Sequence, residues 1–369
     1  MIINSTKEFK EVCKTILMAI DTSEPGIINE TLELVNDGGT LTLSVTANRE
    51  YFVSIKLPLE CDETFRATVN ALLFLKLIFQ LTTDTLELTV DGNALIIKGD
   101  GTYKLPLIFN NEELLKLPKI ELNNVTTSMS IQAATLSSIC QYNTKELQSA
   151  KIVYKPTQKV CYVDDEGAIT YTTGACVNSF TLPKPIKLLL PPKVIKLFKL
   201  FGTDTTVDFL LAQDVETDGK ILTKVKFSTD SIYITAIINN DTQILEAFPV
   251  AAIRAMSTKQ YDYSVLMEKE KTVKALSRLL LFKNDLSTVA DVKFTKDCCT
   301  ITYCNNEEVI GYNDEQYDTL DYELHLNIET LKNILDNSTE DYFTLHFGDH
   351  KGVVVIRQDI KNIIPEWVS

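Results

Sequence analysis

Two hydrophobic periods alternate along this chain, and the same order of periods occurs three times. About ten residues with an apolar stripe at helical spacing are followed by a short polar turn and then by strict alternation of apolar and polar residues. The three segments run from Val69 to Val90, from Leu190 to Leu211 and from Leu326 to Phe347. Each segment therefore predicts a helix that leads into a half-buried strand.

Helix-capping residues agree with these boundaries. Asn70 and Asn327 stand at N-cap positions, Pro191 and Pro192 in a first turn, and Gly202 at a helix end. Two further patterns precede each segment. The alternating strands are expected at 39–48, 167–176 and 299–308, and the amphipathic helices at 6–20, 133–142 and 268–282.

The three occurrences divide the chain into three units of similar length, with expected bounds at 1–122, 123–250 and 251–369. The repeat is far longer than the 20–50 residues of a solenoid, so it predicts a pseudo-threefold α+β protein. A helix–strand repeat with antiparallel patterning needs its helices on one face of the sheet. Open sheet edges invite uncontrolled pairing with other chains. Strands that pair across the unit boundaries would join the units into one continuous sheet, and a ring is one way to close its ends.

Composition removes several classes of function. The 369 residues carry a formal charge of −14, and 45% are hydrophobic, which is enough for ordinary cores. The longest apolar run, Val69 to Leu81, is shorter than the 20 or so residues that span a membrane. The N-terminus lacks the apolar stretch of a secretory signal. We therefore expect a cytoplasmic protein without a membrane partner and with reduced cysteines.

Candidate chemistry is sparse. No nucleotide-binding loop, dinucleotide fingerprint, zinc-protease motif or nucleophile elbow occurs. The histidines are His325, His346 and His350. His346 and His350 are four residues apart, but the alternation around His346 predicts a strand, on which such residues are too distant to share a metal. The sequence thus predicts no enzyme, no metal site and no cofactor.

Three such units in one chain resemble the bacterial-type DNA sliding clamp, the β subunit of the replicative DNA polymerase. The resemblance covers essentially the whole chain and rests on the repeat and on local matches. Residues 168–177 (AITYTTGACV) lie where the family has a strand ending in Ala-Thr-Asp-Gly-His-Arg-Leu. Residues 247–249 (AFP) lie where it has Arg-Phe-Pro. Thr172 and Gly174 match that pattern, whereas Thr173, Ala175 and Cys176 depart from it, which leaves open a phage-encoded or otherwise divergent member.

The resemblance implies a homodimeric ring with six units in all, two helices of each unit lining the hole inside a continuous antiparallel sheet. Such a ring encircles duplex DNA without reading its sequence, is placed there by a clamp loader and tethers the replicative DNA polymerase. It has no catalytic activity. A topological link needs no strong affinity for DNA, so an acidic protein remains compatible with this function if bases line the hole.

Basic residues at helical spacing are the candidates for that lining. Each set is equally typical of an ordinary solvated helix face, and helix 133–142 has no charge. The DNA-facing candidates are Lys7, Lys10, Lys14, Lys76, Lys193, Lys196, Lys199, Lys271, Lys274, Arg278 and Lys332.

The resemblance also implies a head-to-tail dimer interface between the first unit of one chain and the third unit of the next. Alignment carries it to Tyr103 and Leu105 on one side and to Leu281 and Phe282 on the other. The alternative is that all four residues belong to ordinary cores.

Family partners bind through a short linear peptide in a groove between the second and third units. Loss of the family's His-Arg-Leu predicts a changed peptide preference. Residues 361–369 run past the usual end, and Ile363, Ile364 and Trp367 either pack on the third unit or cover the groove. The groove residues carried over are Thr172, Gly174, Ala175, Cys176, Val177, Pro249, Ile253, Val354, Val355, Ile356 and Arg357.

Two other functions remain open. The first is a clamp-fold platform or monomeric processivity factor that does not encircle DNA. The second is an unrelated enzyme on duplicated α+β units, for which the sequence supplies no constellation of polar residues in a recognisable context.

Overall fold

The structure is a computed structural model. It divides into two compact units, which are described separately: 1–137 with 196–239 (unit A), and 138–195 with 240–369 (unit B). The structure describes residues 1–24, 26–47, 50–61, 63–144, 147, 155–215, 221–283, 287–312, 319–348 and 351–367.

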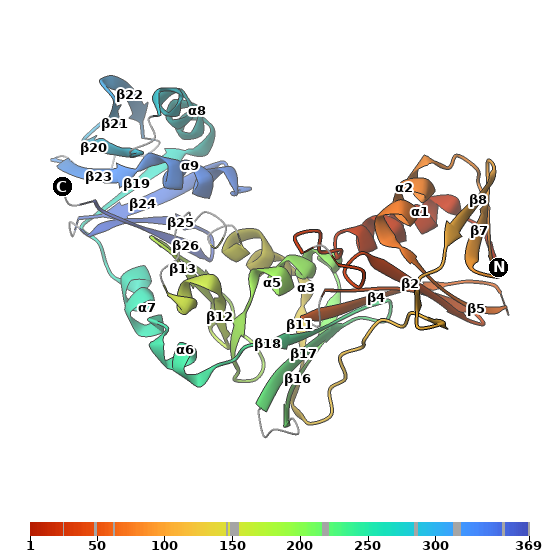
Figure 1. Cartoon of the computed structure of the whole chain (residues 1–369). Coiled ribbons are helices and arrows are strands. Elements are labelled where there is room, and N and C mark those ends of the chain that lie inside the picture. The colour runs from red at the N-terminus through yellow and green to blue at the C-terminus, as the bar shows by residue number, and fades with distance from the viewer. Residues whose placement is uncertain are drawn as a thin grey trace. The chain divides into compact units, whose positions relative to one another are not determined.

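Unit A is built on an eight-stranded antiparallel sheet with α1 (Thr6–Leu17) and α2 (Ala71–Gln80) packed together on one face (Figure 1). Its strands, in spatial order, are β11 (Val125–Gln132), β16 (Thr206–Val215), β17 (Ile221–Ser228), β18 (Ile232–Ile238), β4 (Tyr51–Pro58), β3 (Thr40–Ala47), β2 (Thr31–Asp37) and β5 (Thr64–Asn70). A second sheet has the order β1 (Ile2–Ile3), β6 (Leu86–Asp91), β7 (Ala94–Lys98) and β8 (Thr102–Pro106), and a small hairpin joins β9 (Phe109–Asn110) to β10 (Glu113–Leu114).

Unit B repeats this plan with an eight-stranded and a four-stranded sheet. The larger has the order β15 (Lys187–Leu190), β12 (Cys161–Asp164), β13 (Gly167–Tyr171), β14 (Ala175–Ser179), β26 (Ile360–Pro365), β25 (Gly352–Arg357), β24 (Tyr342–Phe347) and β19 (Tyr263–Glu268). The smaller has the order β22 (Asn306–Gly311), β21 (Cys298–Tyr303), β20 (Val289–Thr295) and β23 (Asp321–Asn327). Its helices include α6 (Thr242–Ala247), α7 (Val250–Thr258), α8 (Lys269–Leu279) and α9 (Ile328–Asp336).

Each eight-stranded sheet combines strands from both sides of an expected unit boundary. In unit A, β4 pairs with β18, with Val53 opposite Ile234. In unit B, β14 pairs with β26, with Ala175 opposite Ile363. Strand pairing therefore joins sequence-distant segments into single sheets, whereas the division at 1–122, 123–250 and 251–369 stays a prediction.

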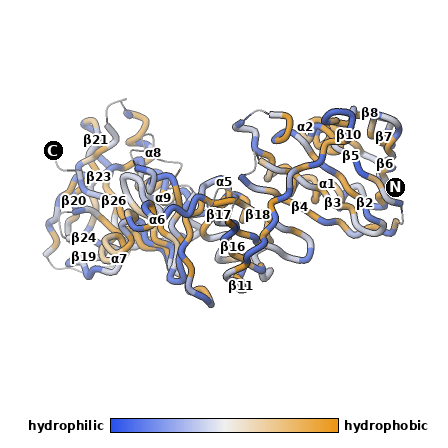
Figure 2. The backbone as a smooth tube through the Cα atoms, turned by 60° about the horizontal axis from the view of Figure 1, so that its bottom comes forward, coloured by the Kyte–Doolittle hydropathy of each residue, from blue (hydrophilic) through white to orange (hydrophobic). Residues whose placement is uncertain are grey.

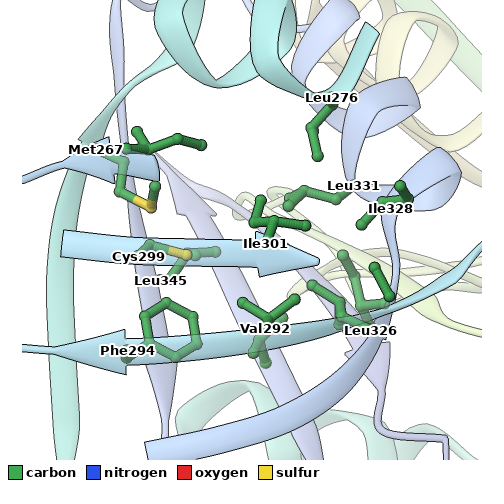
Figure 3. Packing of buried hydrophobic residues seen from close by; sticks show 14 of the residues in the cluster. Met267, Leu276, Val292, Phe294, Cys299, Ile301, Leu326, Ile328, Leu331 and Leu345 are labelled. Carbon is green, nitrogen blue, oxygen red and sulfur yellow. The ribbon is translucent and has the colours of Figure 1, made fainter. Parts of the chain in front are cut away.

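Apolar alternation places one core in unit B beneath α8 and α9. Met267, Phe294, Cys299 and Leu345 from the sheets meet Leu276 of α8 in this core (Figure 3). The tube in Figure 2 shows the same alternation as changes between hydrophobic and hydrophilic colour along the strands. Buried strand residues of one face thus hold the two helices in place.

The helices begin where the capping residues predict. Asn70 Oδ1 accepts a hydrogen bond from the Leu73 amide at 2.9 Å, and Asn327 Oδ1 accepts one from the Thr330 amide at 2.9 Å. Both side chains satisfy a backbone donor that the first helical turn leaves open.

The ends of the other predicted helices differ. The first helix stops at Leu17, and α8 tightens into a 3₁₀ turn at Leu280–Phe282. The segment expected at 133–142 is α3 (Ala133–Ser138) followed by a π-helical turn at Ile139–Asn143. The helix expected between Pro192 and Gly202 is α5 (Pro192–Lys196) followed by a 3₁₀ turn at Leu197–Leu200. Apolar spacing marks the buried stripe but not the hydrogen-bond pattern at its end.

Two predicted strands are hairpins. Residues 167–176 form β13 and the start of β14, and residues 299–308 form most of β21 and the start of β22. In the second hairpin, Cys304 and Asn305 both have positive φ, as a two-residue turn requires. Both strands of a hairpin show period-two alternation, so the pattern alone does not reveal where the chain reverses.

No helix among the described residues is long and apolar enough to cross a membrane. No group of three histidine, cysteine or acidic side chains among these residues is placed to hold a metal ion. His346 lies in β24, as its alternation predicts, and His350 lies outside the described residues.

Candidate functional sites

An apolar cluster in unit B lies between the paired strands β14 and β26 and the helices α6 and α7; we call it the α6–α7 cluster. Its strand residues point away from α8 and α9 because neighbouring side chains of a strand face opposite sides of the sheet. The buried members are Tyr162, Ile169, Ala175, Val177, Leu189, Phe248, Ile253, Val354 and Ile363.

Five of the residues expected in the partner groove contribute apolar atoms to this cluster. Ala175 and Val177 of β14, Ile253 of α7 and Val354 of β25 are buried in it, and Ile356 packs against it partly exposed. Pro249, partly exposed, stands immediately before α7. The structure thus brings together segments about 180 residues apart in sequence.

Three of the expected residues lie on the opposite face of the same strands. Val355 belongs to the core beneath α8 and α9, and Cys176 is fully buried. Arg357 is 3% exposed, and its Nη1 donates to the Ile334 carbonyl at 2.8 Å. Burial lowers the pKa of that guanidinium. Strand alternation therefore removes Cys176, Val355 and Arg357 from the surface that a partner can touch.

Gly174 and Thr172 shape the turn before β14. A Cβ atom at Gly174 would lie 2.4 Å from the Ile363 carbonyl oxygen, so only glycine lets β26 approach this closely. The Thr172 amide donates to the Gly174 carbonyl at 2.9 Å, which closes the turn. Both residues set the shape of the turn beside the cluster.

Aromatic packing fixes the connection between β18 and α7. The Phe248 ring lies 5.2 Å from the Tyr162 ring and 5.3 Å, edge to face, from the Tyr171 ring. Arg254 of α7 pairs with Asp164 at 2.6 Å, which ties the helix to the β12–β13 hairpin. These contacts hold α6 and α7 against the sheet.

Sequence reasoning missed several members of the cluster. Tyr162 and Leu189 come from strands that the repeat did not single out, and α6 and α7 were not predicted at all. Asp241 offers the signal for α6, because its carboxylate accepts a hydrogen bond from the Gln243 amide at 2.7 Å as an N-cap.

The C-terminal segment is not a tail. Ile360–Pro365 forms β26, the strand between β14 and β25, with Ile363 in the α6–α7 cluster and Ile364 in the core on the other face. The wall next to β14 is therefore β26, and β25, which carries the expected groove residues Val354 and Ile356, lies beyond it. Trp367 is half exposed, and its amide donates to the His325 carbonyl at 3.1 Å.

Tyr162 gives the cluster an alkaline pH dependence. Burial, aided by the negative charge of Asp164, raises the pKa of its phenol to about 12, against about 10 for a free tyrosine. The protonated phenol therefore favours the folded state. Its contribution to the free energy of unfolding is complete below pH ~10 and is lost as pH rises toward ~12.

We expect the free energy of unfolding of Tyr162→Phe, measured with denaturant, to fall less steeply across this pH interval than that of the unaltered protein. An identical pH profile for both proteins would contradict this assignment.

The predicted DNA-facing bases differ in their exposure and in the contacts that they make. Lys7 and Lys76 are exposed on the two helices of unit A, Lys196 and Lys199 are exposed on the segment after β15, and Lys193 is half-buried. Lys10 instead donates to the Phe79 and Leu81 carbonyls at the end of α2. Lys10 therefore stabilises that helix end and does not belong to the exposed basic surface.

Acidic neighbours accompany the remaining bases. These ion pairs are exposed or half-exposed, and their N···O distances are 2.5–2.6 Å. Exposed ion pairs contribute little to stability. Phosphate oxygens can therefore replace the carboxylates at low cost. The pairs are Lys14 with Glu11, Lys271 with Glu268, Lys274 with Glu270, Arg278 with Glu308, and Lys332 with Asp336.

The expected interface residues fall into two groups. Leu281 and Phe282, just after α8, are 81% and 54% exposed, unusual for large apolar side chains. Tyr103 is partly exposed on β8, an edge strand of its sheet among the described strands. Leu105 is 4% exposed and packs inward, so ordinary core packing describes it.

Comparison with known proteins finds similarity in structure but not in sequence. No family model and no curated protein matches the chain. The DNA polymerase III subunit beta of Pseudomonas aeruginosa superposes with a TM-score of 0.79 at 15% identity, covering 100% of both chains. The subunit of Borrelia burgdorferi, solved with a natural product, gives 0.80 at 13% identity over 100% of this chain and 98% of that one. The subunit of Thermotoga maritima gives 0.77 at 14% identity over 100% and 99%. From end to end, the chain has the fold of the DNA polymerase III β sliding clamps.

Proposed function

We propose that this protein is a DNA polymerase processivity factor that acts as a sliding clamp. The observation that carries the proposal is a clamp fold over the full chain, with exposed bases on helices that pack on one face of each large sheet. Such bases contact phosphates without reading sequence. The clamp encircles duplex DNA, slides along it and catalyses no reaction, so it needs no cofactor.

The ring is a homodimer in this proposal. Leu281 and Phe282 of one chain pack against the β8 edge of the next, around Tyr103, in a head-to-tail arrangement with two equal interfaces. Unpaired edge strands and exposed apolar side chains are both features that a partner covers. A clamp loader opens the ring in the cytoplasm, at the replication fork.

The α6–α7 cluster is the floor of the partner groove. A short linear peptide of the replicative DNA polymerase docks there with apolar side chains over Ala175, Val177 and Ile356. Ala175 stands where the family has a histidine, so the peptide makes fewer polar contacts at that point and its affinity depends more on apolar anchors.

Primer extension tests the groove. On primed circular single-stranded DNA, with the polymerase and clamp loader of its own replication system, the protein should lengthen the products made in one binding event. Ile356→Asp places a charge beside the groove floor at a partly exposed position, and we expect product length to fall at least about tenfold toward that of polymerase alone.

Val215→Asp is the matched control, because Val215 is 68% exposed on a strand of unit A. It should leave product length unchanged. Equal processivity of Ile356→Asp and the control would exclude this groove. Stimulation by a monomer that is indifferent to DNA ends would instead favour the interaction platform. The acidic side chains paired with the helix bases support this alternative, because they offset the positive charge.

A further inference from the structure

A pocket lies in unit A, on the sheet face opposite α1 and α2. It has a volume of about 410 Å³, within the range of ligand sites. Its walls come from β4, β16, β17 and β18 and from the segment before β11. The lining residues are Phe52, Lys119, Ile120, Glu121, Leu122, Asn123, Val125, Leu210, Lys226, Tyr233 and Thr235.

The floor of this pocket is one row of directly paired residues. Leu210 pairs with Lys226, Lys226 with Thr235, and Thr235 with Phe52, so the row crosses four strands. The row crosses the seam between β18 and β4, which is the pairing that joins strands from the two sides of an expected unit boundary. In the strand order of the two large sheets, this seam occupies the place that the β26–β14 seam has in unit B. The pocket therefore stands at the counterpart of the α6–α7 cluster.

The pocket combines apolar surface with positive charge. The Phe52 and Tyr233 rings stack at 5.8 Å, and Lys226 Nζ lies 5.3 Å from the centre of the Tyr233 ring. Lys119 is exposed at the rim, with Glu121 as the one acid among the lining residues. In a protein of charge −14, two ammonium groups over an apolar floor favour an acidic ligand with an apolar side chain.

One polar atom of the floor lacks a partner. Thr235 is 3% exposed, and its hydroxyl has no hydrogen-bond partner within the described part of the chain. A buried hydroxyl without a partner costs free energy. A ligand that supplies a carbonyl or carboxylate oxygen would remove that cost.

The outer wall is already held in position. Lys224 Nζ donates to the Glu121 carbonyl at 2.9 Å and to Asp214 at 2.6 Å, and Asp214 accepts the Asn124 amide at 2.8 Å. Further back, Thr68 donates to the Leu115 carbonyl at 2.7 Å. The segment is thus fixed on both sides of Lys119 and Ile120. Ligand binding therefore costs little conformational entropy in this segment.

We propose that this pocket binds a short acidic peptide of a partner protein, with a leucine or phenylalanine on the Phe52–Tyr233 floor and a carboxylate at Lys226 and Lys119. The site is separate from the α6–α7 cluster. A clamp dimer thereby offers two kinds of docking site on each chain.

The probe is the peptide acetyl-Gly-Asp-Leu-Phe-Asp-Gly-amide, titrated into the full-length protein with ¹³C-labelled threonine methyl groups. The Thr235 methyl signal, assigned by its loss in Thr235→Val, should shift on titration. A peptide with lysines in place of both aspartates should leave it unmoved.

Four variants locate the binding. Lys226→Glu should weaken binding at the Thr235 signal at least tenfold, because it replaces attraction by repulsion. Lys7→Glu, on the opposite sheet face, should have no effect, and Ile356→Asp should leave the Thr235 shift intact. Thr235→Val should weaken binding two- to tenfold, the usual worth of one neutral hydrogen bond, measured by fluorescence anisotropy of the labelled peptide, without lowering the unfolding midpoint.

A Thr235 methyl signal that stays in place at saturating peptide would overturn the proposal. So would equal binding by Lys226→Glu and Lys7→Glu, or binding that disappears only in Ile356→Asp. Each of these results is independent of whether the protein forms a ring, which is measured by mass and by retention on DNA.

Discussion

Leu281→Asp with Phe282→Asp should convert the proposed homodimer into monomers and abolish its expected retention on circular DNA. The two side chains are 81% and 54% exposed in one chain, so the substitutions remove no core contact. Burying one such side chain contributes about 1.5–3 kcal/mol. Losing both weakens each interface by about 3–6 kcal/mol, a factor of at least ~100 in the dissociation constant, and two aspartates in an apolar contact weaken it further.

Sedimentation equilibrium at micromolar protein checks this result. Val215→Asp with Ile221→Asp is the matched control, because these residues are 68% and 61% exposed on β16 and β17. The control should keep the mass of the unaltered protein, and both variants should keep its circular dichroism. A Leu281→Asp, Phe282→Asp protein that still sediments as a dimer would show that the interface lies elsewhere.

Deleting residues 361–369 should destroy the fold of unit B instead of freeing a groove. The deletion removes most of β26, which pairs with β14 on one side and β25 on the other. It also removes Ile363 and Ile364, which are 5% and 1% exposed. Their burial is worth about 3–6 kcal/mol, a large part of the ~5–15 kcal/mol of a typical native state, and two strands are left with open edges.

Thermal unfolding followed by circular dichroism measures the effect. We expect aggregation or the loss of one cooperative transition, whereas removal of residues 367–369 leaves β26 intact and should leave the transition in place. A stable protein without 361–369 that binds the polymerase peptide more tightly would restore the interpretation of this segment as a covering tail.

The sequence alone predicted the elements that repeat. Helical stripes located α1, α2, α8 and α9, because a buried stripe at a period of 3.6 is a local property. Asn70 and Asn327 marked helix starts for the same reason. The hairpin turns were not predicted, because the alternation continues through both strands. Helix α6 was not predicted, because none of its residues is buried and it therefore shows no apolar stripe.

The candidate partner site could be predicted only in part. Ala175, Val177 and Ile253 were named by resemblance, but resemblance cannot separate the two faces of a strand. Cys176, Val355 and Arg357 therefore entered the list although they point to the other side of the sheet. Tyr162 and Ile363 were not among the named groove residues. The repeat did not single out β12, which carries Tyr162, and β26, which carries Ile363, reaches β14 only through a pairing between distant segments.

Retention on DNA with and without free ends tests the central claim most directly. The protein is loaded by a clamp loader onto nicked circular plasmid, separated from unbound protein by gel filtration in moderate salt, and the plasmid is then cut once by a restriction enzyme. The account predicts a sedimenting mass of twice 41.5 kDa, stable retention on the circle, and release after the cut. A monomeric mass, or binding that is the same before and after the cut, would contradict a closed ring.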